Sequence, residues 1–293
     1  MEKREEIGIL LYNVGGIEYK DEKLDIIMKF IFQNEAILTL DKDINFAYGL
    51  VCKTKEKYKE MEKYFKMAIE QNSMEAMYHY AKYFQEIKHN NRKMLKYFTM
   101  ACQNGHPDAM FSLGQYYWHF ESNGELLEHY YIKAAEKGHK NAMYNLAMYY
   151  QNNKKNYKKM KTYYLLAGTK EAYCNLAMFY HYVEKNYDEM SKYYGMAIEK
   201  GSTKAMINLG LYYEKGEMMK KYIKMAADNW DTDAMVILAH YYWKEENNVD
   251  EMKKYMECAI NYGDKMACLQ LSFYYSSIEK DFEKSAYYLS ISI

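Results

Sequence analysis

The sequence has almost no arginine and no net charge. Its 293 residues include 40 basic and 40 acidic side chains, and its only arginines are Arg4 and Arg92. The sequence therefore lacks the overall excess of positive charge that is typical of proteins that bind nucleic acid or an acidic membrane surface. Arginine also makes the bidentate contacts that read phosphate and guanine, so its scarcity argues further against a nucleic-acid partner.

Long apolar runs and motifs for metals, phosphates or disulfides are also lacking. No segment reaches the roughly 18 apolar residues of a membrane span, and the apolar stretch 7–11 is too short for a signal peptide. The five cysteines are odd in number and predict no disulfide framework. Histidine and cysteine form no metal-ligand motif, and no glycine-rich phosphate loop is present. We therefore expect a reduced, cytoplasmic protein without a cofactor, a metal or a membrane partner.

What the sequence does contain is one phrase, Ala-Met-x-x-Leu-Ala/Gly-x-Tyr-Tyr, repeated at intervals of about 33 residues. The first alanine of each copy is its anchor: Ala76, Ala109, Ala142, Ala172, Ala205, Ala234 and Ala267. A fixed period in this range indicates one supersecondary unit stacked many times. Such stacks have no single catalytic core, and they typically bind along an extended surface.

Each unit reads as two helices. In the copy that begins at Ala142, Leu146 and Tyr150 follow the anchor by four and eight residues, which places all three on one helical face. After a polar stretch, Met160 and Tyr164 show helical spacing again. Position five after the anchor is small in every copy, which indicates close approach by another helix: Ala81, Gly114, Ala147, Ala177, Gly210, Ala239 and Ser272. Glycines just after the second helices favour left-handed C-caps: Gly105, Gly138, Gly201 and Gly263.

The segment 130–147, with Tyr130-Tyr131-Ile-Lys-Ala134-Ala135-Glu-Lys-Gly138 followed by Ala142-Met-Tyr-Asn145-Leu146-Ala147, resembles the Sel1-like branch of the tetratricopeptide repeats. The resemblance covers about residues 45–293. Two features depart from it: the Gly-x-Gly inner loop is missing, and methionine replaces a small residue early in the second helix. A plain tetratricopeptide class therefore stays open. The resemblance implies an all-α fold, a right-handed superhelical α-solenoid of about eight helix hairpins, which is non-enzymatic and serves as an adaptor or scaffold.

The two ends of the chain differ from the repeat. Residues 1–44 are expected to form a divergent helical N-terminal cap, with 45–293 as the repeat solenoid. One further unit, with a shortened first helix, is predicted to begin near Ala47. No polar capping helix follows the last unit, so its C-terminal face is a candidate surface for a partner or for a homo-oligomer.

Two local patterns that resemble functional motifs are better explained by a turn and by core packing. His106-Pro107-Asp108 matches the tripeptide of J-domains, but it lies between two copies, aligned with 139–141, which favours a turn. The tyrosine eight residues after each anchor shares a face with the alanine and leucine and is predicted to be core: Tyr117, Tyr150, Tyr180, Tyr213, Tyr242 and Tyr275. The tyrosine before it is left open between core and surface.

Three asparagines at equivalent positions of consecutive repeats indicate a binding groove. Asn145, Asn175 and Asn208 lie three residues after consecutive anchors, so stacking of the first helices would align them along one groove. Asparagine offers a donor and an acceptor for an extended peptide backbone, and the resemblance implies peptide contact at this position. Hydrogen bonding to a neighbouring helix is the competing explanation. The further residues predicted to line the groove are Gln115, Trp118, Met148, Met178, His181, His240 and Trp243.

These patterns predict a non-enzymatic adaptor that binds a protein or peptide segment in its concave groove. A self-assembling scaffold that uses the C-terminal repeat is the alternative. An enzymatic role in β-lactam binding, linked to cysteine-rich Sel1-like proteins, is disfavoured because the paired cysteines of that group are absent. No residue is predicted to be catalytic.

Overall fold

The structure is a computed structural model that describes residues 42–292. They form two compact units, divided between Lys154 and Lys155, and all of their regular structure is helical. The first unit contains α4 (Lys42–Thr54), α5 (Tyr58–Glu70), α6 (Met74–Glu86), α7 (Asn91–Gln103), α8 (Pro107–His119), α9 (Gly124–Glu136) and α10 (Lys140–Asn152).

The second unit contains α11 (Tyr157–Ala167), α12 (Lys170–Phe179), η1 (Tyr180–Glu184), α13 (Tyr187–Glu199), α14 (Thr203–Tyr212), α15 (Glu217–Asp228), α16 (Thr232–Lys244), α17 (Val249–Asn261), α18 (Lys265–Tyr274), η2 (Tyr275–Glu279) and α19 (Phe282–Ile291). The segments η1 and η2 are single π-helical turns that extend α12 and α18. They were not predicted from the sequence.

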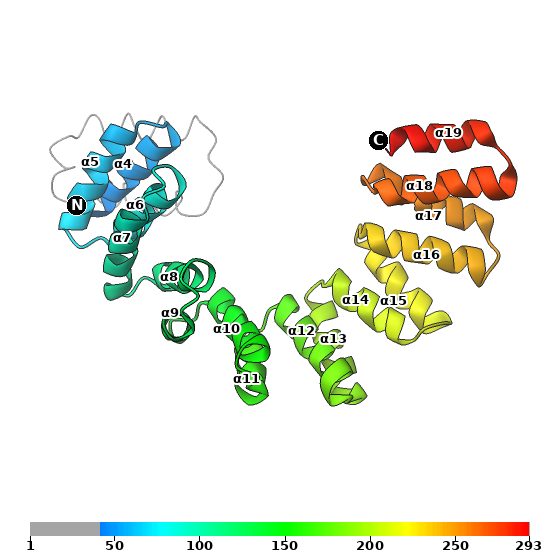
Figure 1. Cartoon of the computed structure of the whole chain (residues 1–293), viewed down its shortest axis with the longest axis horizontal. Helices are drawn as coiled ribbons and strands as arrows, with labels where there is room; N and C mark the ends of the chain where they lie inside the picture. The colour runs from blue at the N-terminus through cyan, green and yellow to red at the C-terminus, as the bar shows by residue number, and fades with distance from the viewer. Residues whose placement is uncertain (1–41, 293) are drawn as a thin grey trace, which may run out of the picture. The chain divides into compact units, whose positions relative to one another are not determined.

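Within each unit, every helix packs against the next one along the chain (Figure 1). The even-numbered helices are the first helices of the repeat and the odd-numbered ones the second helices. The described residues thus contain eight copies of the predicted helix pair: three packed hairpins in the first unit, four in the second, and the copy made by α10 and α11, which the division between the units separates. This arrangement is an all-α solenoid. The expected shortening of the earliest first helix is wrong, because α4 has 13 residues, as many as α6. The proposed N-terminal cap lies almost entirely outside the described residues.

The small residue five positions after the anchor lets the two helices of a hairpin approach each other closely. A Cβ atom added to Gly114 in α8 would collide with the ring of Tyr131 in α9, and one added to Gly210 would lie 2.9 Å from Ile223. Tyr131 and Ile223 are almost completely buried. The prediction of a closely approaching helix at this position is therefore confirmed.

Every first helix from α6 onward begins with the same hydrogen bond. The side chain three residues before the anchor accepts a hydrogen bond from the anchor's backbone N–H, which satisfies a donor that the first turn leaves unpaired. The capping residues are Ser73, His106, His139, Thr169, Ser202, Asp231 and Asp264. Because this cap fixes where each first helix begins, the anchor alanine occupies the same position of the helix in each of these copies.

The turns after the second helices use the predicted glycines. Gly105, Gly138, Gly201 and Gly263 have φ values of 88°, 82°, 77° and 89°, the left-handed region in which a Cβ atom is unfavourable. The turn after α15 is an exception, because Trp230 occupies this position with a φ of 65°.

In five copies, the tyrosine eight residues after the anchor stacks on a tyrosine of the second helix in the same hairpin. The ring centroids of Tyr117 and Tyr130 lie 5.6 Å apart and those of Tyr275 and Tyr288 lie 5.5 Å apart, with nearly parallel planes. The core prediction holds for Tyr150, Tyr242 and Tyr275, but Tyr117 and Tyr180 are only half-buried and Tyr213 is 37% exposed. Tyr213 follows the end of α14, which has 10 residues where α6 and α16 have 13, so its ring is less covered by the hairpin. The preceding position is buried in most copies: Tyr83, Tyr149, Phe179, Tyr241 and Tyr274.

Candidate binding grooves on the first helices

The first unit has a small pocket at the exposed face of α8 and α10. Its volume is about 160 Å³, and it is lined by Trp118, His119, Tyr131, Asn145 and Met148. Three of these residues, Trp118, Asn145 and Met148, were predicted from the sequence to line a groove. We call this site the aromatic pocket.

Asparagines at the third position after the anchor are held by tyrosines of the preceding second helix. The amide nitrogen of Asn145 donates to the Tyr131 hydroxyl at 3.3 Å, and that of Asn175 donates to the Tyr164 hydroxyl at 3.4 Å. Asn208 instead makes a long contact of 3.9 Å to Cys174 Sγ. Each asparagine is only partly buried. The side chains therefore have a structural partner and still reach the surface of the first helices.

A second hollow follows the N-terminal halves of α14, α16 and α18 in the second unit. Its volume is about 660 Å³. Its charged lining consists of Lys204, Asp231, Asp233 and Asp264, and the predicted groove residue Asn208 lies in its wall together with Gln270. We call this hollow the acidic cleft.

The third hollow is apolar and lies between α16 and α18, with α17 as its floor. Its volume is about 390 Å³, and its lining is His240, Trp243, Met252, Met256, Leu269, Gln270, Leu271, Phe273 and Tyr274. We call it the apolar pocket. Gln270 also lines the acidic cleft, so the two hollows adjoin along α18.

His240 is the polar group in the wall of the apolar pocket, together with Gln270. Its Nε2 lies 3.0 Å from the Gln270 side-chain oxygen, and its Nδ1 is buried without a hydrogen-bond partner. Burial lowers the pKa of His240, which outweighs the hydrogen bond to Gln270. A neutral ring that donates from Nε2 fits this geometry.

Four predicted groove residues line none of these three hollows: Gln115, Asn175, Met178 and His181. Gln115 is exposed on α8, and Met178 is half-buried on α12. His181, in η1, packs edge-on against the Tyr212 ring at 5.4 Å, and its Nδ1 is buried without a partner. His181 therefore belongs to the contact between η1 and α14 more than to an open surface.

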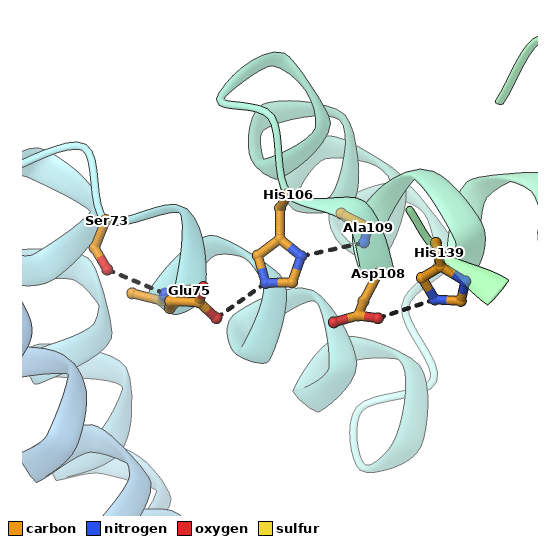
Figure 2. Close-up of polar contacts among 7 residues, drawn as sticks. Ser73, Glu75, His106, Asp108, Ala109 and His139 are labelled. Atoms are coloured by element: carbon orange, nitrogen blue, oxygen red, sulfur yellow. Dashed lines mark hydrogen bonds and ion pairs between the residues drawn. The ribbon is translucent and has the colours of Figure 1, made fainter. Parts of the chain in front are cut away.

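Two capping histidines tie neighbouring hairpins of the first unit together (Figure 2). His106 accepts the Ala109 N–H through Nδ1, and its Nε2 lies 3.0 Å from the Glu75 carboxylate in the preceding first helix. His139 repeats the arrangement, with Nε2 3.0 Å from Asp108. The hydrogen bond from His106 lowers the pKa of the Glu75 carboxyl. The tripeptide 106–108 is thus a helix cap and an inter-repeat bridge, in agreement with the turn interpretation.

Sequence reasoning missed several residues of the acidic cleft and the apolar pocket. Gln270 and Phe273 occupy the same repeat positions as Asn145 and Met148, so extending the pattern to the last copy would have found them. No repeated sequence pattern marks Asp231, Asp233 and Asp264 as residues of the acidic cleft. Asp231 and Asp264 are capping residues that also line the cleft, a double role that only the structure shows.

Residues 42–292 contain no group of three or more potential metal ligands of the His, Cys, Asp or Glu type. None of the helices in this range is long and apolar enough to cross a membrane. All five cysteines are free thiols, and burial raises the pKa of Cys52, Cys102, Cys174 and Cys268.

Solved structures share this fold at low sequence identity. A Sel1 repeat protein from Oxalobacter formigenes aligns with a TM-score of 0.72 and 18% identity over 94% of this chain and 91% of its own. A protective antigen of uropathogenic Escherichia coli strains, which displays the SLR fold, aligns with a TM-score of 0.64 and 20% identity over 98% and 67%. Yeast Tom70 aligns with a TM-score of 0.53 and 13% identity over 92% and 58%. No protein-family model matches the sequence, and no curated protein sequence does either.

The helix pairs and these structural matches define the class. The chain is an α-solenoid built from repeated helix hairpins. Its fold is that of the Sel1-like repeat proteins, as the residues of segment 130–147 predicted.

Proposed function

We propose that this protein is a non-enzymatic adaptor that binds a protein or peptide segment along the exposed face of its first helices. The observation that carries the proposal is the position of the hollows. The aromatic pocket, the acidic cleft and the apolar pocket all have first-helix residues in their walls. Clefts that combine apolar walls with a few polar groups are typical binding sites.

The proposed contact residues are those that the sequence pattern selected. Asn145, Asn175 and Asn208 would bind the backbone of the partner, because a side-chain amide can both donate and accept. Around them, half-buried aromatic and methionine side chains and the exposed Gln115 would supply further contacts of the kind that protein interfaces favour. These neighbours are Gln115, Trp118, Met148, Met178, His181, His240 and Trp243. The proposal places the protein in the cytoplasm, with no nucleic acid, cofactor or metal required.

The test compares two sets of substitutions in capture experiments from a cytosolic lysate, with the captured proteins identified by mass spectrometry. The triple variant Asn145→Ala/Asn175→Ala/Asn208→Ala removes the amides. The control Tyr131→Phe/Tyr164→Phe removes the hydroxyls that hold two of them but leaves the amides in place.

We expect the amide variant to lose a partner that the wild type and the tyrosine control retain. Circular dichroism must show that both variants are folded. If both variants capture the same proteins as the wild type, the asparagines serve only the packing between helices, and the groove assignment is wrong.

Self-assembly is the second candidate function, and one observation favours it. The last described hairpin, α18 and α19, carries a set of exposed apolar side chains: Met266, Leu269, Phe273, Phe282, Tyr287, Leu289 and Ile291. No residue of α19 is buried. Contiguous exposed apolar surface often marks an interaction site. Sedimentation of the purified chain across the micromolar range should then show oligomers that Leu289→Lys abolishes, whereas a monomer at every concentration argues against assembly.

A further inference from the structure

The acidic cleft and the apolar pocket together specify the chemistry of a partner. The cleft contains three aspartates against one lysine, Lys204. None of the ion pairs formed within residues 42–292 includes Asp231, Asp233 or Asp264. The caps to Ala234 and Ala267 fix two of the carboxylates on their helices. A cationic group in the cleft would therefore meet unpaired negative charge at fixed positions.

The apolar pocket adjoins the cleft and supplies a different contact. Trp243 and Phe273 flank it, and the methionines of α17 form its floor. Phe273 is 65% exposed, so its ring is free to cover an inserted side chain. Aromatic walls and flexible methionines suit an aliphatic or aromatic side chain of a partner.

The spacing between the two sites is set by α18. Met266 lines the cleft and Phe273 lines the pocket. Seven helical residues separate them, which is a rise of about 10 Å. An extended peptide covers that length with about three residues, because each residue adds roughly 3.3 Å.

We infer that the groove over α14, α16 and α18 binds an extended basic peptide segment, with its lysine or arginine in the acidic cleft and an apolar side chain about three residues away in the apolar pocket. This inference rests on the proposed groove function and names the partner's chemistry. A net-negative cleft beside an apolar pocket disfavours an acidic segment, because like charges across an interface are repulsive.

The test uses fluorescently labelled synthetic peptides and measures their anisotropy on the full chain. The probe is a Gly/Ser peptide that carries two adjacent lysines and a leucine three residues further on. Matched peptides replace the lysines by glutamate or the leucine by serine.

Two protein variants have matched controls within the same unit. Phe273→Ala removes a wall of the pocket, and Phe282→Ala removes an equally exposed phenylalanine outside it, at 69% exposure. Asp233→Asn removes a cleft charge, and Asp188→Asn removes an exposed aspartate from the same first-turn position of α13.

We expect Phe273→Ala to weaken binding of the lysine–leucine peptide by about tenfold. Asp233→Asn should weaken it by about threefold at low salt and by less at high salt. The two controls should bind like the wild type, and the glutamate and serine peptides should bind more weakly.

Equal binding of the lysine and glutamate peptides, or binding that ignores Phe273→Ala, overturns the inference. If no peptide of the set binds while the asparagine-dependent capture persists, this inference fails and the proposed function stands. If both experiments are negative, the proposed function fails as well.

Discussion

His106 gives the sharpest prediction about how neighbouring hairpins are held together. Its side chain is 3% exposed, caps α8 through Ala109, contacts Glu75 of α6, and stacks on the Tyr78 ring at 4.5 Å. Replacement by alanine removes all of these contacts, and replacement by serine restores only the cap. Serine is a fair test because Ser73 and Ser202 cap the equivalent helices of this chain.

The magnitudes follow from the contacts. Loss of an N-cap costs about 1 kcal/mol, and removal of a buried, stacked ring costs about 1 to 2 kcal/mol more. The hydrogen bond to Glu75 adds little, because that carboxylate is 46% exposed and contributes less than about 1 kcal/mol. We therefore expect His106→Ala to lower the free energy of unfolding by about 2 to 4 kcal/mol, and His106→Ser by about 1 kcal/mol less than that.

Urea denaturation can measure this within the first unit. Trp118 lies in that unit, whereas Trp230 and Trp243 lie in the second. A Trp230→Phe/Trp243→Phe background, shared by every variant, makes the fluorescence report on Trp118 alone. If the alanine and serine variants unfold at the same urea concentration as their parent, the bridge contributes nothing and the reasoning is refuted. If they are equally destabilised, the cap is not the important contact.

Three further predictions follow from local geometry. Gly114→Ala should destabilise by about 1 kcal/mol or more, because its Cβ would collide with a ring of α9, whereas Gly195→Ala, with open space around it, should stabilise by about 0.5 to 1 kcal/mol in thermal unfolding. A thiol-reactive dye on the native protein should label Cys258 quickly and the four buried cysteines slowly; fast labelling of several would contradict the burial. Glu75→Gln should cost less than about 1 kcal/mol at neutral pH. A lowered folded pKa stabilises above the unfolded value of about 4.3, so this cost should vanish as pH falls through the folded pKa, and a constant cost would be the contrary result.

The hairpin architecture could be predicted from the sequence because each copy of the repeat must satisfy the same packing and turn requirements. The small residue at Gly114 and the turn glycines such as Gly138 each appear in several copies, so their meaning could be read by comparison. The earliest first helix was predicted to be shortened because the sequence around Ala47 matches the repeated motif poorly. Tertiary packing against α5 and α6 nevertheless accompanies a full-length helix there.

The candidate sites were less predictable, since they depend on which side chains meet across different hairpins. Periodicity placed Asn145 on the first-helix face, but it could not show that Tyr131 binds its amide. The acidic cleft needs Asp231, Asp233 and Asp264 from two turns that are more than 30 residues apart, and a cap looks the same in sequence whether or not it also lines a hollow. The double role of His106 is hidden for the same reason.

Site-specific photo-crosslinking tests the central claim, binding along the first-helix face, most directly. A benzoylphenylalanine at Gln115 lies on the exposed face of α8, and one at Lys133 lies on the exposed face of the paired second helix α9. The account predicts a discrete crosslinked partner from position 115 that is absent from position 133. Adducts from position 133 alone, or the same adducts from both positions, would contradict it.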